Sequence, residues 1–360
     1  MTDIISSTLK TINGIAAVAV HPLVPASLLT FVAYSPPDML RRFPSLNRLH
    51  QLLTANFVVR YRLPLQILLV AGIARYLNRA ANRWALNNWR LTSHPGWRWA
   101  NEIAVVTGGC NGIGKAIVIG LAQKGVTVAV LDIQPMPADL RANQKVKYWK
   151  CDITSPEAVS ASATEIRASL GNPSIVVNNA GVAYTHSVIE TDPEDLRRIF
   201  GVNLLSLWST AKEFIPDMIM KNKGHIVTVA SMASYSALPT AVDYSATKAG
   251  ALAFSEGLSC EIKHVYKASG ILTTVVHPMW VKTNMTAAHA ERVEQSYGRM
   301  MEPEDVAKRV TGQIFSCRGG QLIIPDQWSW ASGNRGLPSW VQEIMRDAVG
   351  REVPRLGEAK

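Results

Sequence analysis

Acidic side chains are nearly missing from the first hundred residues, where Asp3 and Asp38 stand against eleven lysines and arginines. This excess gives residues 1–100 a formal charge of +9, whereas the whole chain carries +10. The basic charge is therefore not spread over the body of the protein, as a nucleic-acid-binding surface would require. A basic segment beside apolar stretches favours an anionic membrane surface, and we expect no nucleic acid partner.

Cysteine is also scarce, and the four cysteines show no CxxC or Cys/His spacing typical of a metal site. We expect no metal, and free thiols of this kind are typical of a reducing compartment. Glycine and proline contents are ordinary and 48% of the residues are hydrophobic, which excludes a disordered chain. A chain of 360 residues can hold one large α/β domain plus an appendage.

Residues 12–33 contain no formally charged side chain and approach the length of one bilayer crossing. His21, Pro22 and Pro25 interrupt this apolar run. A re-entrant or hairpin insertion therefore fits better than a straight span, and a kinked crossing stays open. No basic n-region and no small-residue cleavage site mark a cleaved signal peptide.

Residues 63–74 are apolar but too short to span, and they continue into a segment with helical periodicity. One side of that helix carries Leu69, Ile73, Tyr76, Leu77, Ala80 and Trp84, and a separate stripe carries Arg75, Arg79 and Arg83. The pattern predicts an interfacial amphipathic helix. A helix packed on a catalytic domain, with solvated arginines, is the alternative. We expect residues 1–98 to form a membrane-associating region.

From residue 102 onward, short apolar runs such as EIAVVT, VTVAVL and SIVVNN alternate with helical stretches. This alternation predicts an α/β domain over residues 99–330, with a Rossmann-type doubly wound parallel sheet of about seven strands. Residues 284–301 are expected to form a substrate lid, with Met285, Met300, Met301 and Tyr297 as either adaptable apolar surface or ordinary packing. Residues 331–360 are expected to form a C-terminal amphipathic helix and tail, which could dock on the body, a partner subunit or the membrane.

The first predicted strand leads into TGGCNGIG, residues 107–114, and a helix follows. Gly108, Gly112 and Gly114 allow a tight turn, close approach of a pyrophosphate and close helix packing, and the phosphates would lie at a helix N-terminus. The second strand ends at Asp132, 18 residues after Gly114. A carboxylate there accepts hydrogen bonds from ribose hydroxyls and repels the extra phosphate of NADP, so NAD is favoured over NADP.

Tyr244 and Lys248 are four residues apart in DYSATKAG, residues 243–250, and are neighbours on one helix face. A fixed cation favours the phenolate, so Lys248 is predicted to lower the pKa of Tyr244 and to make it an acid/base. Taken alone, the pair fits an ordinary helix tyrosine beside a snorkelling lysine better, because a tyrosine and a lysine four residues apart are common.

In this order, TGGCNGIG, NNAG at 178–181 and YSATK at 244–248 resemble the short-chain dehydrogenase/reductase family over about residues 102–325. The resemblance implies Tyr244 as general acid/base, with Lys248 holding the nicotinamide ribose. Ser231, which precedes Tyr244 by 13 residues, would orient the substrate oxygen, and Asn203 would support a proton-relay water. Asp152 would meet the adenine, and Asn178 would hold the sheet together. Cofactor contacts are implied for Gly108, Asn111, Gly112, Ile113, Gly114, Asp132, Asp152, Ile153, Asn179, Tyr244, Lys248, Val281 and Thr283.

One motif departs from the family, because Met279 in HPMWVKTNM, residues 277–285, replaces the usual glycine. The backbone near the nicotinamide is therefore expected to follow a different path. HPxWVxT and GHIVTVAS are similar to the membrane-associated retinol and 17-beta-hydroxysteroid dehydrogenase branch.

The resemblance implies hydride transfer between NAD(H) and an alcohol or carbonyl of a retinoid, steroid or fatty alcohol. It also implies a homodimer through the helices of Asn203 and Tyr244. The expected location is the endoplasmic reticulum or lipid droplets, with the catalytic domain in the cytosol. The alternatives are a tailoring ketoreductase or dehydrogenase of a secondary-metabolite pathway and a non-catalytic, dinucleotide-binding lipid-droplet scaffold. A scaffold would tolerate loss of Asn203, Ser231, Tyr244 and Lys248, all of which this chain retains.

Overall fold

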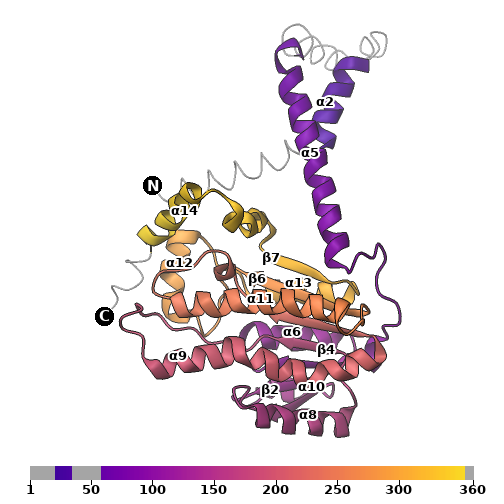
Figure 1. The fold of residues 1–360 in the computed structure, drawn as a ribbon, viewed down its shortest axis with the longest axis vertical. Coiled ribbons are helices and arrows are strands. Elements are labelled where there is room, and N and C mark those ends of the chain that lie inside the picture. The colour runs from indigo at the N-terminus through magenta and orange to yellow at the C-terminus, as the bar shows by residue number, and fades with distance from the viewer. Residues whose placement is uncertain (1–20, 35–57, 353–360) are drawn as a thin grey trace. The chain divides into compact units, whose positions relative to one another are not determined.

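The computed structural model describes residues 21–34 and 58–352, which divide between two compact units, residues 1–85 and 86–360 (Figure 1). The first unit holds helix α2, Leu23–Tyr34, and nearly all of helix α5, Val58–Leu86. The apolar run at 12–33 thus lies partly outside the described residues.

Helix α5 confirms that the arginine-striped segment is helical, although Pro64 lies inside it. Ile73, Tyr76, Leu77 and Trp84 are exposed along this helix. Within the described residues, no helix combines the length and the apolarity that a membrane crossing needs.

Residues 86–98, assigned by sequence to the N-terminal region, are hydrogen-bonded within the second unit. The side-chain nitrogen of Asn88 donates to the carbonyl oxygens of Ser269 and Ile271 at 2.9 and 3.1 Å. Asn87 is buried, and its side-chain oxygen accepts from the Gly319 amide at 3.2 Å. This stretch therefore packs with the sheet-containing unit.

The second unit contains the predicted sheet, with seven strands, all parallel, in the order β3-β2-β1-β4-β5-β6-β7. The strands are β1 Ile103–Thr107, β2 Thr127–Asp132, β3 Val146–Lys150, β4 Ile175–Asn178, β5 Gly224–Val229, β6 Ile271–Pro278 and β7 Gly320–Ile324. Strand order reverses between β1 and β4. In open α/β sheets the crevice at the carboxyl ends of the strands, beside such a reversal, is where ligands bind.

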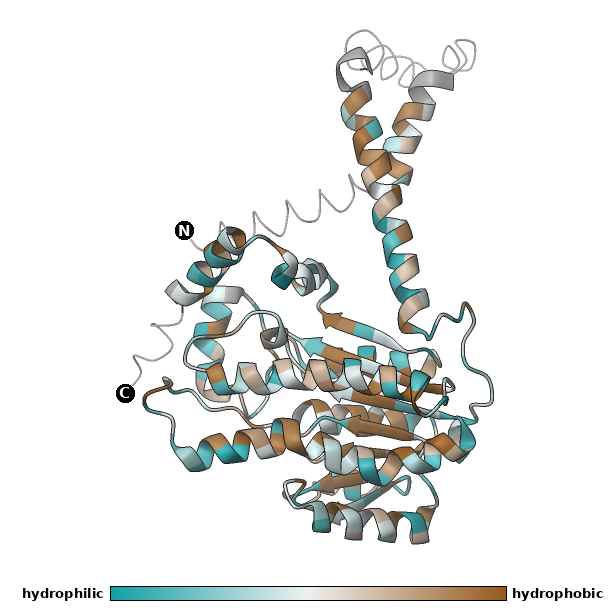
Figure 2. Cartoon of the chain, in the orientation of Figure 1, coloured by the Kyte–Doolittle hydropathy of each residue, from teal (hydrophilic) through white to brown (hydrophobic). Residues whose placement is uncertain are grey.

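Helices cover both faces of the sheet, as near-continuous apolar strands require. Ala104 and Val106 of β1 face helices α6, Gly112–Gln123, and α13, Pro303–Phe315. The alternate residue, Val105, faces the opposite side with helices α8 Pro156–Leu170, α10 Ser206–Lys221 and α11 Val242–His264. The central strands of the sheet are accordingly mostly hydrophobic (Figure 2).

The remaining elements are short or lie at the sheet ends. Helices η2 Trp99–Asn101, α7 Ala138–Arg141 and α9 Pro193–Phe200 precede the π-helical turn η3, Gly201–Leu205, which leads directly into α10. The segments after β5, β6 and β7 are η4 Met232–Ser234, then η5 Ala287–His289 with α12 Ala290–Tyr297, and finally η6 Asp326–Gly336 with α14 Ser339–Glu352. These last segments follow the carboxyl ends of their strands and so adjoin the crevice (Figure 1).

Candidate active site

A cavity of about 1300 Å³ lies at the carboxyl ends of the strands. It is larger than the roughly 300–1,000 Å³ of ordinary small-molecule pockets, which suits a site shared by a cofactor and a substrate. The glycine loop and the β2 and β3 ends line one part, and Ser231, Tyr244 and the segments after β6 and β7 line another.

The glycine loop has the backbone that its sequence predicts. Gly108 and Gly112 have φ angles of +64° and +50°, which side-chain-bearing residues rarely adopt. A β-carbon on Gly114 would collide with the Gly108 carbonyl oxygen and the Asn179 side chain. Asn111 caps α6 by accepting from the Gly112 amide at 2.9 Å. The N-terminus of α6 therefore faces the cavity with little side-chain bulk, which suits a pyrophosphate.

Asp132 is buried at the end of β2 and lines the cavity. Its two carboxylate oxygens accept from the backbone amides of Cys110 and Gln134, each at 2.9 Å. These bonds fix the carboxylate between the glycine loop and the β2 end, and each oxygen keeps a further acceptor position. Burial, together with Asp132, raises the pKa of the Cys110 thiol to about 12, so this cysteine is a neutral part of the loop.

Two further residues implied at the adenosine half hold the backbone in place. Asp152 is exposed at the cavity edge and accepts from the amide and hydroxyl of Thr154 at 2.9 and 2.7 Å, with Ile153 buried between them. The Asn179 side chain donates to the carbonyl oxygens of Thr107 and Gly108, each at 3.1 Å. Asn179 therefore joins the glycine loop to the end of β4.

Asn178 points the other way from its neighbour. Its side-chain oxygen accepts from the buried Thr210 hydroxyl of α10 at 2.9 Å. This bond ties β4 to α10, in agreement with the structural role predicted for Asn178.

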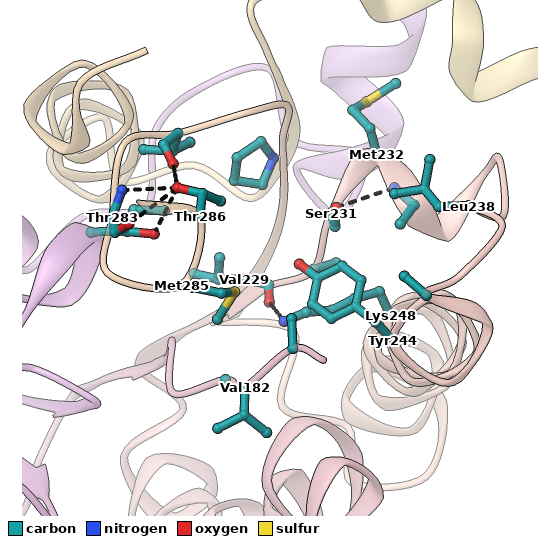
Figure 3. Close-up of a pocket in the computed structure, with 18 of the residues that line it drawn as sticks. Val182, Val229, Ser231, Met232, Leu238, Tyr244, Lys248, Thr283, Met285 and Thr286 are labelled. Carbon is teal, nitrogen blue, oxygen red and sulfur yellow. Dashed lines mark hydrogen bonds between the residues drawn. The ribbon is translucent and has the colours of Figure 1, made fainter. Parts of the chain in front are cut away.

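Ser231, Tyr244 and Lys248 come together at the cavity from β5 and α11, as Figure 3 shows. The Ser231 hydroxyl oxygen accepts from the Ala233 amide at 3.1 Å, so its hydrogen can be donated elsewhere. The Lys248 ammonium donates to the Val229 carbonyl oxygen at 2.9 Å and lies 5.6 Å from the centroid of the Tyr244 ring.

The ionisation of this group differs from the sequence prediction. Burial raises the pKa of Tyr244 above its ordinary value, and a hydrogen bond from Ser231 offsets this only in part. Burial also lowers the pKa of Lys248 to about 8. The prediction that Lys248 lowers the pKa of Tyr244 is therefore wrong for the protein alone, because its ammonium is bonded to β5 and desolvation of the phenol dominates.

Asn203 lies in the π-helical turn η3 and is buried. Its side chain accepts from the Val182 amide at 2.8 Å and donates to the Val182 carbonyl oxygen at 2.9 Å. It also donates to the Thr247 hydroxyl at 3.1 Å, next to Lys248. Asn203 therefore links the loop after β4 to α11 immediately behind the tyrosine and lysine.

Met279 does not disturb the sheet, despite replacing the family glycine. Its amide donates to the Ile324 carbonyl oxygen at 2.9 Å, which prolongs the pairing of β6 and β7. Val281 is buried in a bridge with Met301, and the Thr283 methyl group lies 3.1 Å from where a β-carbon on Gly112 would stand. The segment after β6 thus closes against the glycine loop, as its Val-x-Thr motif predicts.

The predicted lid contributes to the cavity through Met285, Thr286, His289 and Val293. Met300 is instead buried and Met301 packs against the core, while the Tyr297 side chain lies outside the described residues. The C-terminal segment at 331–360, for which the sequence left three docking sites open, lines the cavity with Asn334, Met345 and Val349, next to Trp328 and Trp330.

Sequence reasoning missed three polar residues that line the cavity or contact its lining. His277 was noted only as part of a motif, and its ring contacts the Ser231 carbonyl oxygen. Tyr235 lines the cavity and contacts His277. Asn334 lines the cavity from η6, and its side-chain oxygen is buried without a hydrogen-bond partner in the part of the chain that the structure describes. The polar HP step after an apolar strand was a usable signal for His277.

Known proteins match the chain in the same region. A family model described as short chain dehydrogenase matches residues 102–294. Dehydrogenase RED2 of Cochliobolus heterostrophus is 44% identical over 191 residues, which covers 53% of this chain and 71% of that protein. Human estradiol 17-beta-dehydrogenase 11 is 32% identical over 221 residues, covering 60% and 72%.

A solved structure, 3-ketoacyl-(acyl-carrier-protein) reductase from Brucella melitensis complexed with NADH, shares the fold with a TM-score of 0.56 at 21% identity. The match covers 63% of this chain and 98% of that one. With a glycine loop, an acid at the β2 end and the Ser-Tyr-Lys group in one cavity, the chain belongs to the short chain dehydrogenase family of nicotinamide-dependent oxidoreductases, with similarity to its 17-beta-hydroxysteroid dehydrogenase members.

Proposed function

We propose that the protein transfers hydride between NAD(H) and an alcohol or carbonyl group of a lipophilic substrate. The observation that carries the proposal is the meeting of Ser231, Tyr244 and Lys248 in the cavity that also contains the glycine loop. When bound, the nicotinamide supplies or accepts the hydride. The protein residues then have to bind the substrate oxygen and move its proton.

Tyr244 is assigned the proton transfer. Because burial raises its pKa, the phenol is protonated at neutral pH and can donate its proton to a carbonyl oxygen during reduction. In alcohol oxidation the phenolate accepts the hydroxyl proton instead. Ser231 is assigned a hydrogen bond to the same oxygen, since its hydroxyl already accepts from Ala233 and has its hydrogen to give.

Lys248 and Asn203 are assigned supporting roles. The Lys248 ammonium is buried near the Tyr244 ring, in a position to hold a ribose hydroxyl of the cofactor. Asn203 holds Val182 beside this group and contacts Thr247, one residue before Lys248. In our proposal a water held near Asn203 returns the proton to solvent.

NAD is the proposed cofactor because Asp132 presents a buried carboxylate where an adenosine ribose would lie. The neighbours that contact the carboxylate are the uncharged amides of Cys110 and Gln134. Two ribose hydroxyls can donate to the remaining acceptor positions, whereas a phosphate at that ribose would bring its negative charge against the carboxylate.

A lipophilic substrate is supported by the side chains that cover the cavity away from the glycine loop. Met279, Met285, Val293, Trp328, Trp330 and Met345 line it. Flexible methionines and large aromatic rings adapt to apolar molecules of varied shape. We propose retinoids, steroids or fatty alcohols as the substrate class.

We also propose that the region predicted over residues 1–98 attaches the protein to the endoplasmic reticulum or to lipid droplets through the part that precedes Leu86, with the catalytic unit in the cytosol. Exposed apolar side chains along α5 and the arginine stripe at 75, 79 and 83 support this. The full chain should sediment with membranes and remain there in high salt, which screens only the arginines. Recovery of the full chain in the soluble fraction at physiological salt would contradict the proposal.

A homodimer through η3–α10 and α11 is proposed on the family resemblance. Leu205 and Trp208 are exposed at this surface, and the Trp208 ring contacts Phe254 of α11 at 4.7 Å between centroids. Light scattering of the detergent-solubilised full chain measures the assembly, and a monomeric mass would contradict it.

The test of the catalytic proposal is Tyr244→Phe, assayed against a panel of lipophilic alcohols and ketones with NAD(H) and NADP(H). The variant should lose turnover while its NADH fluorescence titration stays close to that of the wild type, because only the phenol oxygen is removed. Substantial turnover by the phenylalanine variant would remove Tyr244 from its role. Binding of NADH by a wild-type protein that turns over nothing in the panel would favour the non-catalytic scaffold.

A further inference from the structure

Behind Ser231 lies a buried chain of hydrogen bonds that crosses from β7 to β5. The His277 ring contacts the Ser231 carbonyl oxygen through Nδ1 at 3.0 Å and the Tyr235 hydroxyl through Nε2 at 3.1 Å. The Gln321 side-chain nitrogen contacts the same Tyr235 hydroxyl. The Tyr235 and His277 rings also pack together, with centroids 4.7 Å apart. We name Gln321, Tyr235 and His277 the serine-backing chain.

For a neutral His277, donor and acceptor chemistry fixes the direction of every hydrogen bond among these residues. A carbonyl oxygen only accepts, so His277 must carry its hydrogen on Nδ1 and donate it to Ser231. The unprotonated Nε2 then accepts from the Tyr235 hydroxyl. The amide nitrogen of Gln321 only donates, so it donates to the Tyr235 oxygen. Each group thus has one compatible arrangement, with a neutral His277.

The surroundings of His277 keep it neutral. The ring is fully buried, and burial, aided by the Lys248 charge on α11, lowers its pKa to about 4. The charged groups that act on Tyr235 are Glu256 of α11 and Arg335 of η6. Arg335 also donates to the Tyr235 carbonyl oxygen at 3.5 Å. Over the ordinary working pH range no residue of the serine-backing chain therefore titrates.

We propose that the serine-backing chain makes His277 a positioning residue for hydride transfer, because it fixes the Ser231 peptide and so aims the Ser231 hydroxyl at the substrate oxygen. The inference rests on the proposed role of Ser231. The Ser231 carbonyl is held by His277, and its hydroxyl is held by the Ala233 amide. The peptide is thus anchored on both sides, which leaves the hydroxyl hydrogen directed into the cavity.

The sheet supplies a matched control in His225 of β5. This histidine is also fully buried, and within the described residues its ring makes one hydrogen bond, from Nε2 to the Thr274 hydroxyl at 2.8 Å. Burial lowers its pKa to about 3. His225 pairs with Leu272, five residues before His277 on β6, so the two histidines stand roughly 16 Å apart along the strand direction. Replacement of His225 perturbs the same sheet at the amino-terminal ends of its strands, away from the cavity at their carboxyl ends.

The activity arm compares His277→Leu, His277→Asn and His225→Leu in the detergent-solubilised full chain. His277→Leu should lower kcat by about 10–100-fold through misplacement of the serine, with the KM for NAD unchanged. His277→Asn should recover most of that loss, because its side-chain nitrogen stands close to the position of Nδ1 and can donate to Ser231. His225→Leu should leave kcat near the wild-type value.

Two activity results would overturn the inference. One is an equal loss of kcat in the His225 and His277 leucine variants, which would indicate general disruption of the sheet. The other is a His277→Asn variant as slow as His277→Leu, which would show that donation to Ser231 is unimportant.

The second arm does not depend on turnover. Nitrogen-15 NMR of histidine-labelled protein, with the His277 signals assigned from their loss in His277→Asn, should show a neutral ring protonated on Nδ1 from pH 5.5 to 9. Protonation on Nε2, or titration of the ring within this pH range, would contradict the hydrogen-bond arrangement of the serine-backing chain. If the wild type turned over no substrate, the proposed function would fail. The NMR spectrum would still test the hydrogen-bond arrangement of the serine-backing chain.

Discussion

Replacing Lys248 by methionine should stabilise the cofactor-free protein at neutral pH while removing its activity. The lysine is only 4% exposed, and burial lowers its pKa from 10.5 to about 8. The unfolded chain therefore binds the proton more tightly than the folded protein does, and stability rises with pH between these values. Below about pH 8 the buried charge lowers the free energy of unfolding by its full amount, roughly 3 kcal/mol, at 1.36 kcal/mol per pKa unit.

Methionine has a similar length without the charge, but it cannot donate to the Val229 carbonyl oxygen as Lys248 does. Loss of that bond costs about 1 kcal/mol. The net gain at pH 7 is therefore about 2 kcal/mol, which corresponds to about 5 °C in Tm. At pH 9.5 the penalty in the wild type has fallen by about 2 kcal/mol, so the advantage of the variant should nearly vanish.

The measurement is urea unfolding, followed by tryptophan fluorescence, of wild type and variant at pH 7 and 9.5 without cofactor. Lys221→Met is the matched control, since this lysine of α10 is exposed and its loss should change little at either pH. A Lys248→Met variant that is less stable than the wild type at pH 7 would refute the reasoning. A stability difference that is the same at both pH values would also refute it, because the charge would then not be its cause.

Three other results are expected. Asp132→Asn and Asp132→Ala should each reduce the preference for NAD over NADP in kcat/KM by about tenfold or more through loss of the negative charge; an unchanged ratio in steady-state assays would contradict this. Asn334→Leu should raise Tm, because Asn334 is 4% exposed and its side-chain oxygen has no hydrogen-bond partner among the described residues. Asn178→Leu should instead lower Tm, because Asn178 is 6% exposed and bonded to Thr210, and the opposite order in thermal unfolding would show that Asn334 is structurally engaged. Alcohol oxidation should accelerate steadily as the pH is raised through the alkaline range, since the raised pKa of Tyr244 limits the amount of phenolate. Ser231→Ala should move this rise to higher pH, because it removes a bond that lowers the pKa of Tyr244, and a pH-independent rate would count against Tyr244 as the base.

Features that depend on neighbours in the chain were predictable from the sequence. The apolar runs alternate with helical stretches, and the structure has the predicted parallel sheet of seven strands. The glycine loop needs residues without side chains at fixed local positions, and the positive φ angles of Gly108 and Gly112 agree with that need. Asp132 ends β2 as expected, because a strand followed by an acid is a local pattern. The resemblance to the family implied that Ser231 acts with Tyr244 and Lys248, and all three line one cavity.

Other features arise only when distant segments meet. The serine-backing chain joins residues from η4, β6 and β7, and no local pattern pairs His277 with Tyr235, 42 positions away. The C-terminal segment covers the cavity, although its amphipathic pattern allowed three docking partners. The sign of the Tyr244 pKa shift was wrong from sequence because helical spacing gives proximity but not burial. Tyr244 is buried where α11 packs against the sheet, and this burial raises the pKa of its phenol. The nearby Lys248 ammonium is hydrogen-bonded to Val229 of β5 and does not offset that rise.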